Sequence, residues 1–223
     1  MHPIDSKELI IINDIIICFF TDFPVYNYTM YGTIIGMFNK EKFEIYKSLI
    51  LDYSRHTNLV SKKSLENIEI RHFEDSKQLS NYITKGSTII DMGSGAGFPG
   101  VVLAILGYKV FCVESIIKKA NFLNLVKNKL NLKNLIICNE RLENFLKNRT
   151  FDKKTVFTAR AFAPLIEILE YIHIFNYPAF LLKGRKIEEE IFEANKKFKF
   201  YYELKKSITG DGFIIKVEKI KKY

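Results

Sequence analysis

The stretch that decides the fold is Ile89-Ile90-Asp91-Met92-Gly93-Ser94-Gly95-Ala96-Gly97-Phe98-Pro99-Gly100. Here a short apolar strand runs into a glycine-rich turn, and the apolar residues after the turn predict a helix. Glycines at such a turn let the backbone bend tightly and approach a ligand, because no Cβ atom is in the way. The first N–H groups of the next helix have no partner within it. The stretch therefore predicts a site for a nucleotide-like ligand.

The spacing of the glycines narrows the choice of ligand. They follow Gly-x-Gly-x-Gly and not the Gly-x-Gly-x-x-Gly of dinucleotide-binding proteins, and Asp91 comes just before them. A carboxylate suits a ligand that carries an ammonium and a sulfonium group, whereas it would repel a pyrophosphate. We therefore expect S-adenosyl-L-methionine as the cofactor, bound near Asp91, Gly93 and Gly95.

A second acidic residue, Glu114, supports a nucleoside. It ends the next apolar strand, where a carboxylate accepts hydrogen bonds from both ribose hydroxyls. NAD would be held in the same way, so Glu114 does not separate the two cofactors. Capping the following helix is an alternative role for Glu114, although Ser115 could fill it.

From Gly86 onward, short apolar runs alternate with longer amphipathic ones. Strands are expected at 88–92, 109–114, 134–138, 155–158 and 179–182, with helices at 98–106, 116–130, 142–147, 165–175 and 187–196. This alternation implies a mostly parallel sheet with helices on both faces. The runs 198–204 and 213–217, joined by a turn at Gly210-Asp211-Gly212, predict an antiparallel hairpin. The fold class is therefore α/β: a doubly wound, Rossmann-like sheet of the class I adenosylmethionine-dependent methyltransferase kind, closed by a hairpin.

The first third of the chain has a different pattern. Apolar residues at helical spacing predict a helix over 40–53 and a second one from Ser64 toward Tyr82. Residues 1–36 have no clean period, because Pro24 and two glycines interrupt them. We expect an extension of undetermined structure over 1–36, a helical segment over 37–85 packed on the core, and a methyltransferase domain over 86–223.

Composition limits the class of protein. With 223 residues and 48% hydrophobic residues, the chain can form one large core, which excludes a disordered, collagen-like or disulfide-scaffold protein. Lysine and arginine (34) exceed aspartate and glutamate (25), and the net charge of +9 favours a polyanion or an anionic membrane surface as partner. A biased genome rich in lysine, asparagine and isoleucine would explain the same excess.

Cysteine usage and the N-terminus point to the cytoplasm. The three cysteines are widely spaced and show no metal-ligand pattern, so we expect reduced thiols and no metal. The N-terminus lacks the positive region of a secretory signal. The apolar run 9–20 is interrupted by Asn13-Asp14 and is too short to span a membrane, so no membrane association is expected.

Seven blocks together resemble a known family. They are Asn58-Leu59-Val60-Ser61, Arg71-His72-Phe73-Glu74-Asp75-Ser76, the turn Asp91 to Gly100, Glu114-Ser115 with Lys118-Lys119 and Phe122-Leu123, Glu140-Arg141-Leu142-Glu143, Thr158-Ala159-Arg160-Ala161, and Leu182-Lys183-Gly184. In this order they are similar to the guanine-N7 methyltransferases of small-subunit ribosomal RNA, the RsmG family, formerly called glucose-inhibited division protein B. The family usually has a tryptophan before the first block; this chain has none, and Tyr53 stands in the matching place.

The resemblance implies an activity and a set of contacts. It implies methyl transfer from S-adenosyl-L-methionine to N7 of a guanine in the decoding-region loop of 16S rRNA, with 16S rRNA or the small ribosomal subunit as partner. It also implies cofactor contacts at Gly93, Phe98, Leu142, Glu143 and Arg160, with Glu114 at the ribose.

Guanine N7 carries a free lone pair, so methyl transfer is an in-line displacement that needs no general base. Positioning and desolvation then supply the rate, and we assign no catalytic acid, base or nucleophile. Because no RNA-binding motif is present, we expect recognition of shape and of a splayed-out base.

On the RNA side, we expect Arg71 and His72 at the entrance of the substrate pocket, and Lys183 and Arg185 in a basic turn after the fifth strand. Ion pairs are the alternative roles: one on the surface for Arg160, and one within a helix between Arg71 and Asp75.

Two other functions stay open on the sequence alone. The glycine turn fixes the cofactor and not the acceptor, so the substrate could be another RNA or a small molecule. The chain could also be a noncatalytic RNA-binding assembly protein that keeps the fold. The sequence says little about the oligomeric state, and a monomer is expected.

Overall fold

The structure, a computed structural model, describes residues 9–12, 15–18, 26–57, 59–61, 65–210 and 212–223. The predictions that concern Asn58, Ser64 and Asp211 fall outside these residues. By its internal contacts the chain divides into two compact units, Met1–Glu41 and Lys42–Tyr223. The boundaries expected at 36/37 and 85/86 stay predictions.

The first unit contains a small hairpin, in which β1 (Leu9–Ile12) pairs antiparallel with β2 (Ile15–Cys18). Helix α1 (Tyr26–Tyr53) begins well before the predicted start at Lys40. Gly32 and Gly36 lie inside this helix. The helix tolerates them, because an isolated glycine weakens a helix by about 1 kcal/mol without ending it.

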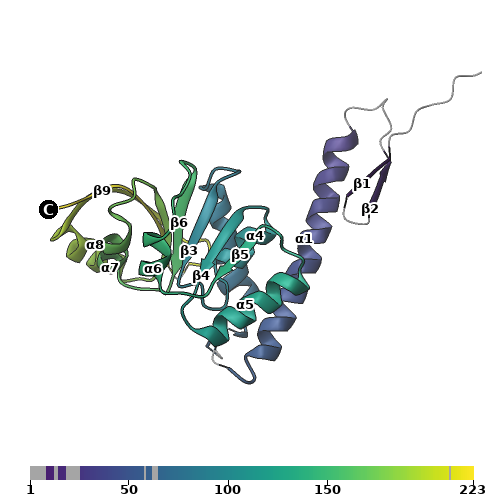
Figure 1. The fold of residues 1–223 in the computed structure, drawn as a ribbon, viewed down its shortest axis with the longest axis horizontal. Coiled ribbons are helices and arrows are strands. Elements are labelled where there is room, and N and C mark those ends of the chain that lie inside the picture. The colour runs from purple at the N-terminus through teal and green to yellow at the C-terminus, as the bar shows by residue number, and fades with distance from the viewer. Residues whose placement is uncertain (1–8, 13–14, 19–25, 58, 62–64, 211) are drawn as a thin grey trace, which may run out of the picture. The chain divides into compact units, whose positions relative to one another are not determined.

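The second unit is built on one seven-stranded sheet with the order β5-β4-β3-β6-β7-β9-β8 (Figure 1). The strands are β3 (Thr88–Met92), β4 (Lys109–Val113), β5 (Leu135–Cys138), β6 (Thr155–Arg160), β7 (Ala179–Lys183), β8 (Phe198–Lys206) and β9 (Phe213–Lys222). The strands from β5 to β7 are parallel, and β9 runs antiparallel to both of its neighbours. The predicted doubly wound sheet with a terminal hairpin is confirmed.

The chain order reverses at β3, since β4 lies on one side of it and β6 on the other. Met92 pairs with both Val113 and Ala159, and Lys183 pairs with Phe213. The carboxyl ends of the four parallel strands β3, β4, β6 and β7 therefore share one edge with the turn of the β8–β9 hairpin. Doubly wound sheets bind ligands at this edge.

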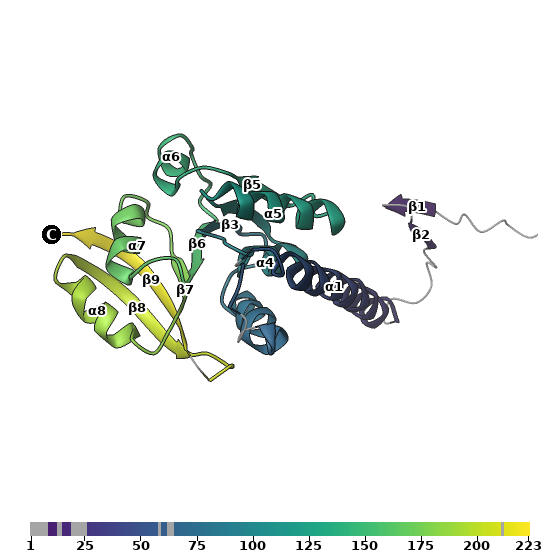
Figure 2. The same cartoon turned by 90° about the horizontal axis from the view of Figure 1, so that it is seen from below.

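Helices cover both faces of the sheet (Figures 1 and 2). They are α4 (Gly100–Ile105), α5 (Ile117–Lys129), α6 (Leu142–Lys147), α7 (Leu165–Ile172) and α8 (Ile187–Asn195). Side chains of a strand alternate between the faces: Ile89 belongs to the core cluster under α4 and α5, and Ile90 to the cluster under α6, α7 and α8. The near-continuous apolar strands follow from this double covering.

The second predicted N-terminal helix is helical but not regular. It consists of a π-helical turn (Glu69–Glu74), α3 (Asp75–Lys77) and a 3₁₀ turn (Gln78–Asn81). The π-helical turn buries two consecutive residues, His72 and Phe73. Such turns are rare and often occur at functional sites.

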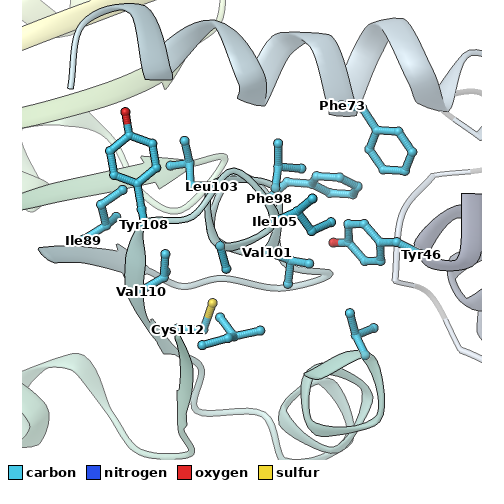
Figure 3. Close-up of a cluster of buried hydrophobic side chains, with 14 of the residues drawn as sticks. Tyr46, Phe73, Ile89, Phe98, Val101, Leu103, Ile105, Tyr108, Val110 and Cys112 are labelled. Carbon is cyan, nitrogen blue, oxygen red and sulfur yellow. The ribbon is translucent and has the colours of Figure 1, made fainter. Parts of the chain in front are cut away.

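An aromatic cluster joins this helical segment to the glycine turn (Figure 3). Tyr46 packs against Phe73 and Phe98, with ring centroids 5.5 Å apart in both pairs. The Tyr46 hydroxyl donates a 2.6 Å hydrogen bond to the carbonyl of Ala96. This bond fixes the glycine turn to a helix that lies fifty residues earlier in the chain.

Candidate cofactor and acceptor site

The glycine turn has the backbone that a ligand cradle requires. Gly93 and Gly95 have φ angles of +65° and +58°, in the left-handed region that favours glycine. A Cβ atom at Gly95 would meet only the Gly93 carbonyl, at 3.9 Å, so the Cα of Gly95 faces open space. A Cβ atom at Gly93 would collide with the Phe162 ring. A ligand can therefore approach the backbone at Gly95, beside Phe162.

Glu114 faces this turn from the end of β4. Its Oε2 accepts the Gly95 N–H at 2.9 Å, and its Oε1 accepts the Ile116 N–H at 2.8 Å. The residue is only 5% exposed, so its carboxylate is fixed in place. Each carboxylate oxygen keeps a second lone pair, which leaves it able to accept a ribose hydroxyl.

Asp91 supports the turn from behind. Its side chain is fully buried; Oδ2 accepts the Gly100 N–H at 3.1 Å, and Oδ1 accepts the Thr158 hydroxyl at 3.3 Å. The sequence predicts a cofactor contact for this carboxylate, but its contacts in the structure are with groups of the chain itself. A direct cofactor contact by Asp91 stays a prediction; in the structure the carboxylate holds the first turn of α4 against β3.

Burial raises the pKa of Asp91 to about 7, even though hydrogen bonds from Ser94, Gly100 and Thr158 act in the opposite direction. Glu114 raises this pKa further, and the Cys112 thiol lies 4.0 Å from Oδ2. In the unfolded chain the carboxyl ionises near its ordinary value of 3.8. The folded state therefore holds the proton more tightly.

The raised pKa predicts a loss of stability as pH rises from about 4 to about 7, because the unfolded chain gives up this proton first. The loss amounts to roughly 4 kcal/mol at about 1.4 kcal/mol per pH unit. Asp91→Asn removes the titration, so the variant should gain stability relative to wild type over this pH range, and the difference should level off above it. Urea unfolding at each pH measures the difference. A difference that does not change with pH would contradict the assignment.

A second buried group near the turn titrates in the opposite sense. Burial, with Arg160 and Arg71 nearby, lowers the pKa of His72 to about 3. The stability that His72 contributes is present above about 6.5 and is lost as pH falls toward 3. Because this contribution is the same in wild type and in Asp91→Asn, it cancels in the difference between them.

Phe98, His72 and Arg160 form one group beside the turn. The His72 ring stacks on Phe98 at 4.6 Å, and the Arg160 guanidinium lies 5.7 Å from the same ring. Neither ring nitrogen of His72 has a hydrogen-bond partner among the described residues, and the same is true of Arg160 Nη1. These buried polar groups are the kind that a bound ligand satisfies. The Phe98 side chain faces the aromatic cluster, so its predicted cofactor contact stays a prediction.

A cavity of about 770 Å³ opens at the same sheet edge, beyond β6 and β7. Its lining residues include Arg160, Phe162, Lys183, Asp75 and Glu190. Its volume is in the range of sites for small molecules. Two residues with separate predicted roles, Arg160 for the cofactor and Lys183 for RNA, thus line one cavity.

Lys183 is held in place in the lining of this cavity. Its ammonium group donates to the Ala163 carbonyl at 2.7 Å and to Glu190 at 2.6 Å, and its side chain is 8% exposed. Glu190 Oε2 also accepts the Leu165 N–H at 2.7 Å. The pair therefore fixes the 163–165 segment. An RNA contact by Lys183 stays a prediction.

Asp75, which also lines the cavity, is the centre of a polar network. Its Oδ1 accepts hydrogen bonds from Ser207 at 2.7 Å and from Gln78 at 2.8 Å, and its Oδ2 lies 3.7 Å from Arg160 Nη1. Ser207 and Thr209 belong to the turn of the β8–β9 hairpin. The network therefore joins this turn to the N-terminal helical segment and to the end of β6.

The other predicted residues lie farther apart. Leu142 is buried and Glu143 is exposed at the start of α6, where Glu143 accepts a 3.3 Å hydrogen bond from Tyr171. Arg71 and Arg185 are both exposed. Their cofactor and RNA contacts stay predictions.

Two residues at the site, Phe162 and Glu190, are not predicted from the sequence, and Asp75 is considered there only as an ion-pair partner of Arg71. Phe162 follows the Arg160-Ala161 block at the carboxyl end of a strand, and that position could have singled it out. Asp75 is recognised through Ser207, and Glu190 through Lys183 and Leu165; these contacts exist only in the folded chain.

The residues present fit S-adenosylmethionine: an approachable glycine backbone at Gly95, a fixed carboxylate at Glu114, and unsatisfied polar groups on His72 and Arg160. In the part of the chain that the structure describes, no cluster of histidine, cysteine or acidic side chains could hold a metal ion. Within the same residues, no helix has the length and apolar character to cross a membrane.

Three features together define the class of Rossmann-like, adenosylmethionine-dependent methyltransferases. They are the order of the strands in the sheet, the glycine turn after β3, and Glu114 at the end of β4. Solved structures share this fold. A mutant of MtNAS in complex with S-adenosylmethionine matches with a TM-score of 0.55 and 15% identity, over 82% of this chain and 77% of that one. A SAM-dependent methyltransferase from Aquifex aeolicus matches with a TM-score of 0.52 and 16% identity, over 67% and 91%.

Within this class, the family model GidB, rRNA small subunit methyltransferase G, matches residues 39–212. Ribosomal RNA small subunit methyltransferase G of Rickettsia prowazekii is 36% identical over 187 residues, which cover 82% of this chain and 95% of the relative. The protein of the same name from Orientia tsutsugamushi (strain Ikeda) is 41% identical over 175 residues, covering 77% and 85%. The chain belongs to the rRNA small subunit methyltransferase G family, as the sequence blocks predicted.

Proposed function

We propose that this protein transfers a methyl group from S-adenosyl-L-methionine to N7 of a guanine in the decoding-region loop of 16S rRNA. The observation that carries the proposal is the shared sheet edge: Phe162 contacts the glycine turn, which fits the methyl donor, and also lines a cavity that fits an acceptor. Membership of the family supports ribosomal RNA as the substrate.

The residues of the glycine turn hold the donor. The Gly95 backbone lets the cofactor approach, Glu114 accepts the ribose hydroxyls, and Arg160 with His72 offers donors to its polar end. When bound, the cofactor would supply an electrophilic methyl group to the N7 lone pair, with its neutral thioether as the leaving group and the positive charge passing to the guanine ring.

No residue of this chain has to remove a proton, because N7 of guanine is unprotonated at neutral pH. His72 is uncharged there and buried, and Asp91 is fully enclosed. The chain therefore acts by orienting the donor and the acceptor and by excluding water from the edge between them.

The proposed partner is 16S rRNA or the small ribosomal subunit that contains it, in the cytoplasm where that subunit is assembled. The net charge of +9 supports a polyanionic partner. Exposed Arg71 and Arg185 are the proposed phosphate contacts, and binding should weaken with salt.

Mass spectrometry of 16S rRNA from cells with and without the gene tests the function. Loss of one N7-methylguanosine from the decoding-region loop, restored by the purified protein and S-adenosylmethionine, is the expected result. A new site in another RNA would redirect the substrate assignment. An unchanged modification pattern, together with no transfer in vitro, would reject the activity.

A further inference from the structure

Phe162 contacts both halves of the site. It lies in the loop between β6 and α7, is partly buried, and lines the 770 Å³ cavity. Its ring also lies directly against Gly93, where a Cβ atom would collide with it. One aromatic residue therefore borders both the glycine turn and the cavity.

The chain fixes this ring in place. Tyr171 packs against Phe162 with ring centroids 6.1 Å apart, and Lys183 and Glu190 hold the loop just after it. Ala161, directly before it, has a φ angle of +49°, which costs energy in a residue with a Cβ atom. Strain of this kind persists where the surroundings determine the conformation, often at ligand sites.

The cavity suits a planar, polar base. Aromatic rings give base-stacking surfaces, and flipped bases are read through their hydrogen-bonding edges. Guanine presents two adjacent donors, N1–H and N2–H₂, which one carboxylate can accept together. Four acidic residues line the cavity, and three of them have ion-pair partners: Asp75, Glu190 and Glu193. The fourth, the exposed Glu189, has no ion-pair partner among the described residues.

We propose that Phe162 is the stacking surface for the acceptor base: the cavity takes a guanine flipped out of the RNA, and the ring of Phe162 holds its N7 toward the glycine turn. This inference rests on the proposed function and names the residue that positions its substrate.

Stacking against Phe162 also acts on the rate. As the N7–carbon bond forms, the guanine ring becomes cationic, and the face of an aromatic ring attracts a cation. The contact is therefore stronger in the transition state than in the substrate complex, and an interaction of that kind raises kcat.

Three single variants test the proposal. Phe162→Leu keeps an apolar side chain but loses the aromatic face, and Phe162→Tyr keeps the face. Phe192→Leu makes the first change at an aromatic residue of α8 that is 66% exposed. The assays are calorimetric titration with S-adenosylmethionine, and kcat and KM with small subunits from cells that lack the gene.

Phe162→Leu should lower kcat/KM for RNA by about 10- to 100-fold, with much of the loss in kcat, while cofactor affinity changes by less than about threefold. Phe162→Tyr and Phe192→Leu should behave like wild type.

Two results would overturn the inference: wild-type rates in Phe162→Leu, or an equal loss of cofactor affinity and rate that Phe162→Tyr does not restore. The second result would mean that the ring merely supports the glycine turn. Wild-type protein that methylates no guanine would instead overturn the proposed function, and this inference with it.

Discussion

Gly93→Val should abolish S-adenosylmethionine binding, with a loss of affinity of at least about 100-fold. Gly93 has a φ angle of +65°, where a β-branched residue is strained, and its added Cβ atom would strike the Phe162 ring. The displaced ring and the new side chain would then close the approach to the turn. Isothermal titration calorimetry of the folded variant measures the loss.

The control for this prediction is Gly86→Val. Gly86 has a similar φ angle of +79°, but a Cβ atom there would meet nothing within 4 Å. Gly86→Val should lose stability through backbone strain and still bind the cofactor within about threefold of wild type. Equal binding by both variants would show that the turn does not cradle the cofactor.

Glu114→Gln should weaken cofactor binding by about 100-fold or more. A carboxylate that accepts two ribose hydroxyls makes two charge-assisted hydrogen bonds, worth about 1.5–3 kcal/mol each. The amide that replaces it would also turn an NH₂ group toward the N–H of Gly95 or Ile116, since the carboxylate accepts from both. Titration with S-adenosylmethionine and with its 2′-deoxy analogue measures the effect.

Wild type should discriminate strongly between the two ligands, and Glu114→Gln only weakly. Glu140→Gln is the matched control, since Glu140 follows the neighbouring strand β5 and pairs with Arg149 at 2.9 Å. It should bind both ligands as wild type does. Undiminished discrimination in Glu114→Gln would place the ribose elsewhere.

The sheet was predictable because its signals are local. Strand β3 and helix α6 begin and end where the apolar pattern predicts, at Thr88–Met92 and Leu142–Lys147. Each strand buried on both faces appears as a short apolar run, and each helix has its own period. The early start of α1 was not predicted, because Gly32 and Gly36 interrupt the apolar pattern without ending the helix.

The inner arrangement of the site could not be predicted, because it depends on contacts between distant residues. Nothing near Asp91 shows that its carboxylate turns inward to Gly100. Nor does the sequence around Lys183 show that Glu190 and the Ala163 carbonyl hold its ammonium group. Charge and position at the sheet edge indicated these residues; only the packed structure supplies their partners.

The network around Asp75 has a consequence for the growing chain. Ser207, which donates to Asp75, lies 132 residues farther along, and Thr209 and Gly212 of the same hairpin line the cavity. During synthesis from the N-terminus, the glycine turn and Glu114 emerge long before this hairpin. The acceptor wall is completed only after the β8–β9 hairpin has left the ribosome. A nascent or truncated chain that ends before this hairpin therefore lacks the finished cavity.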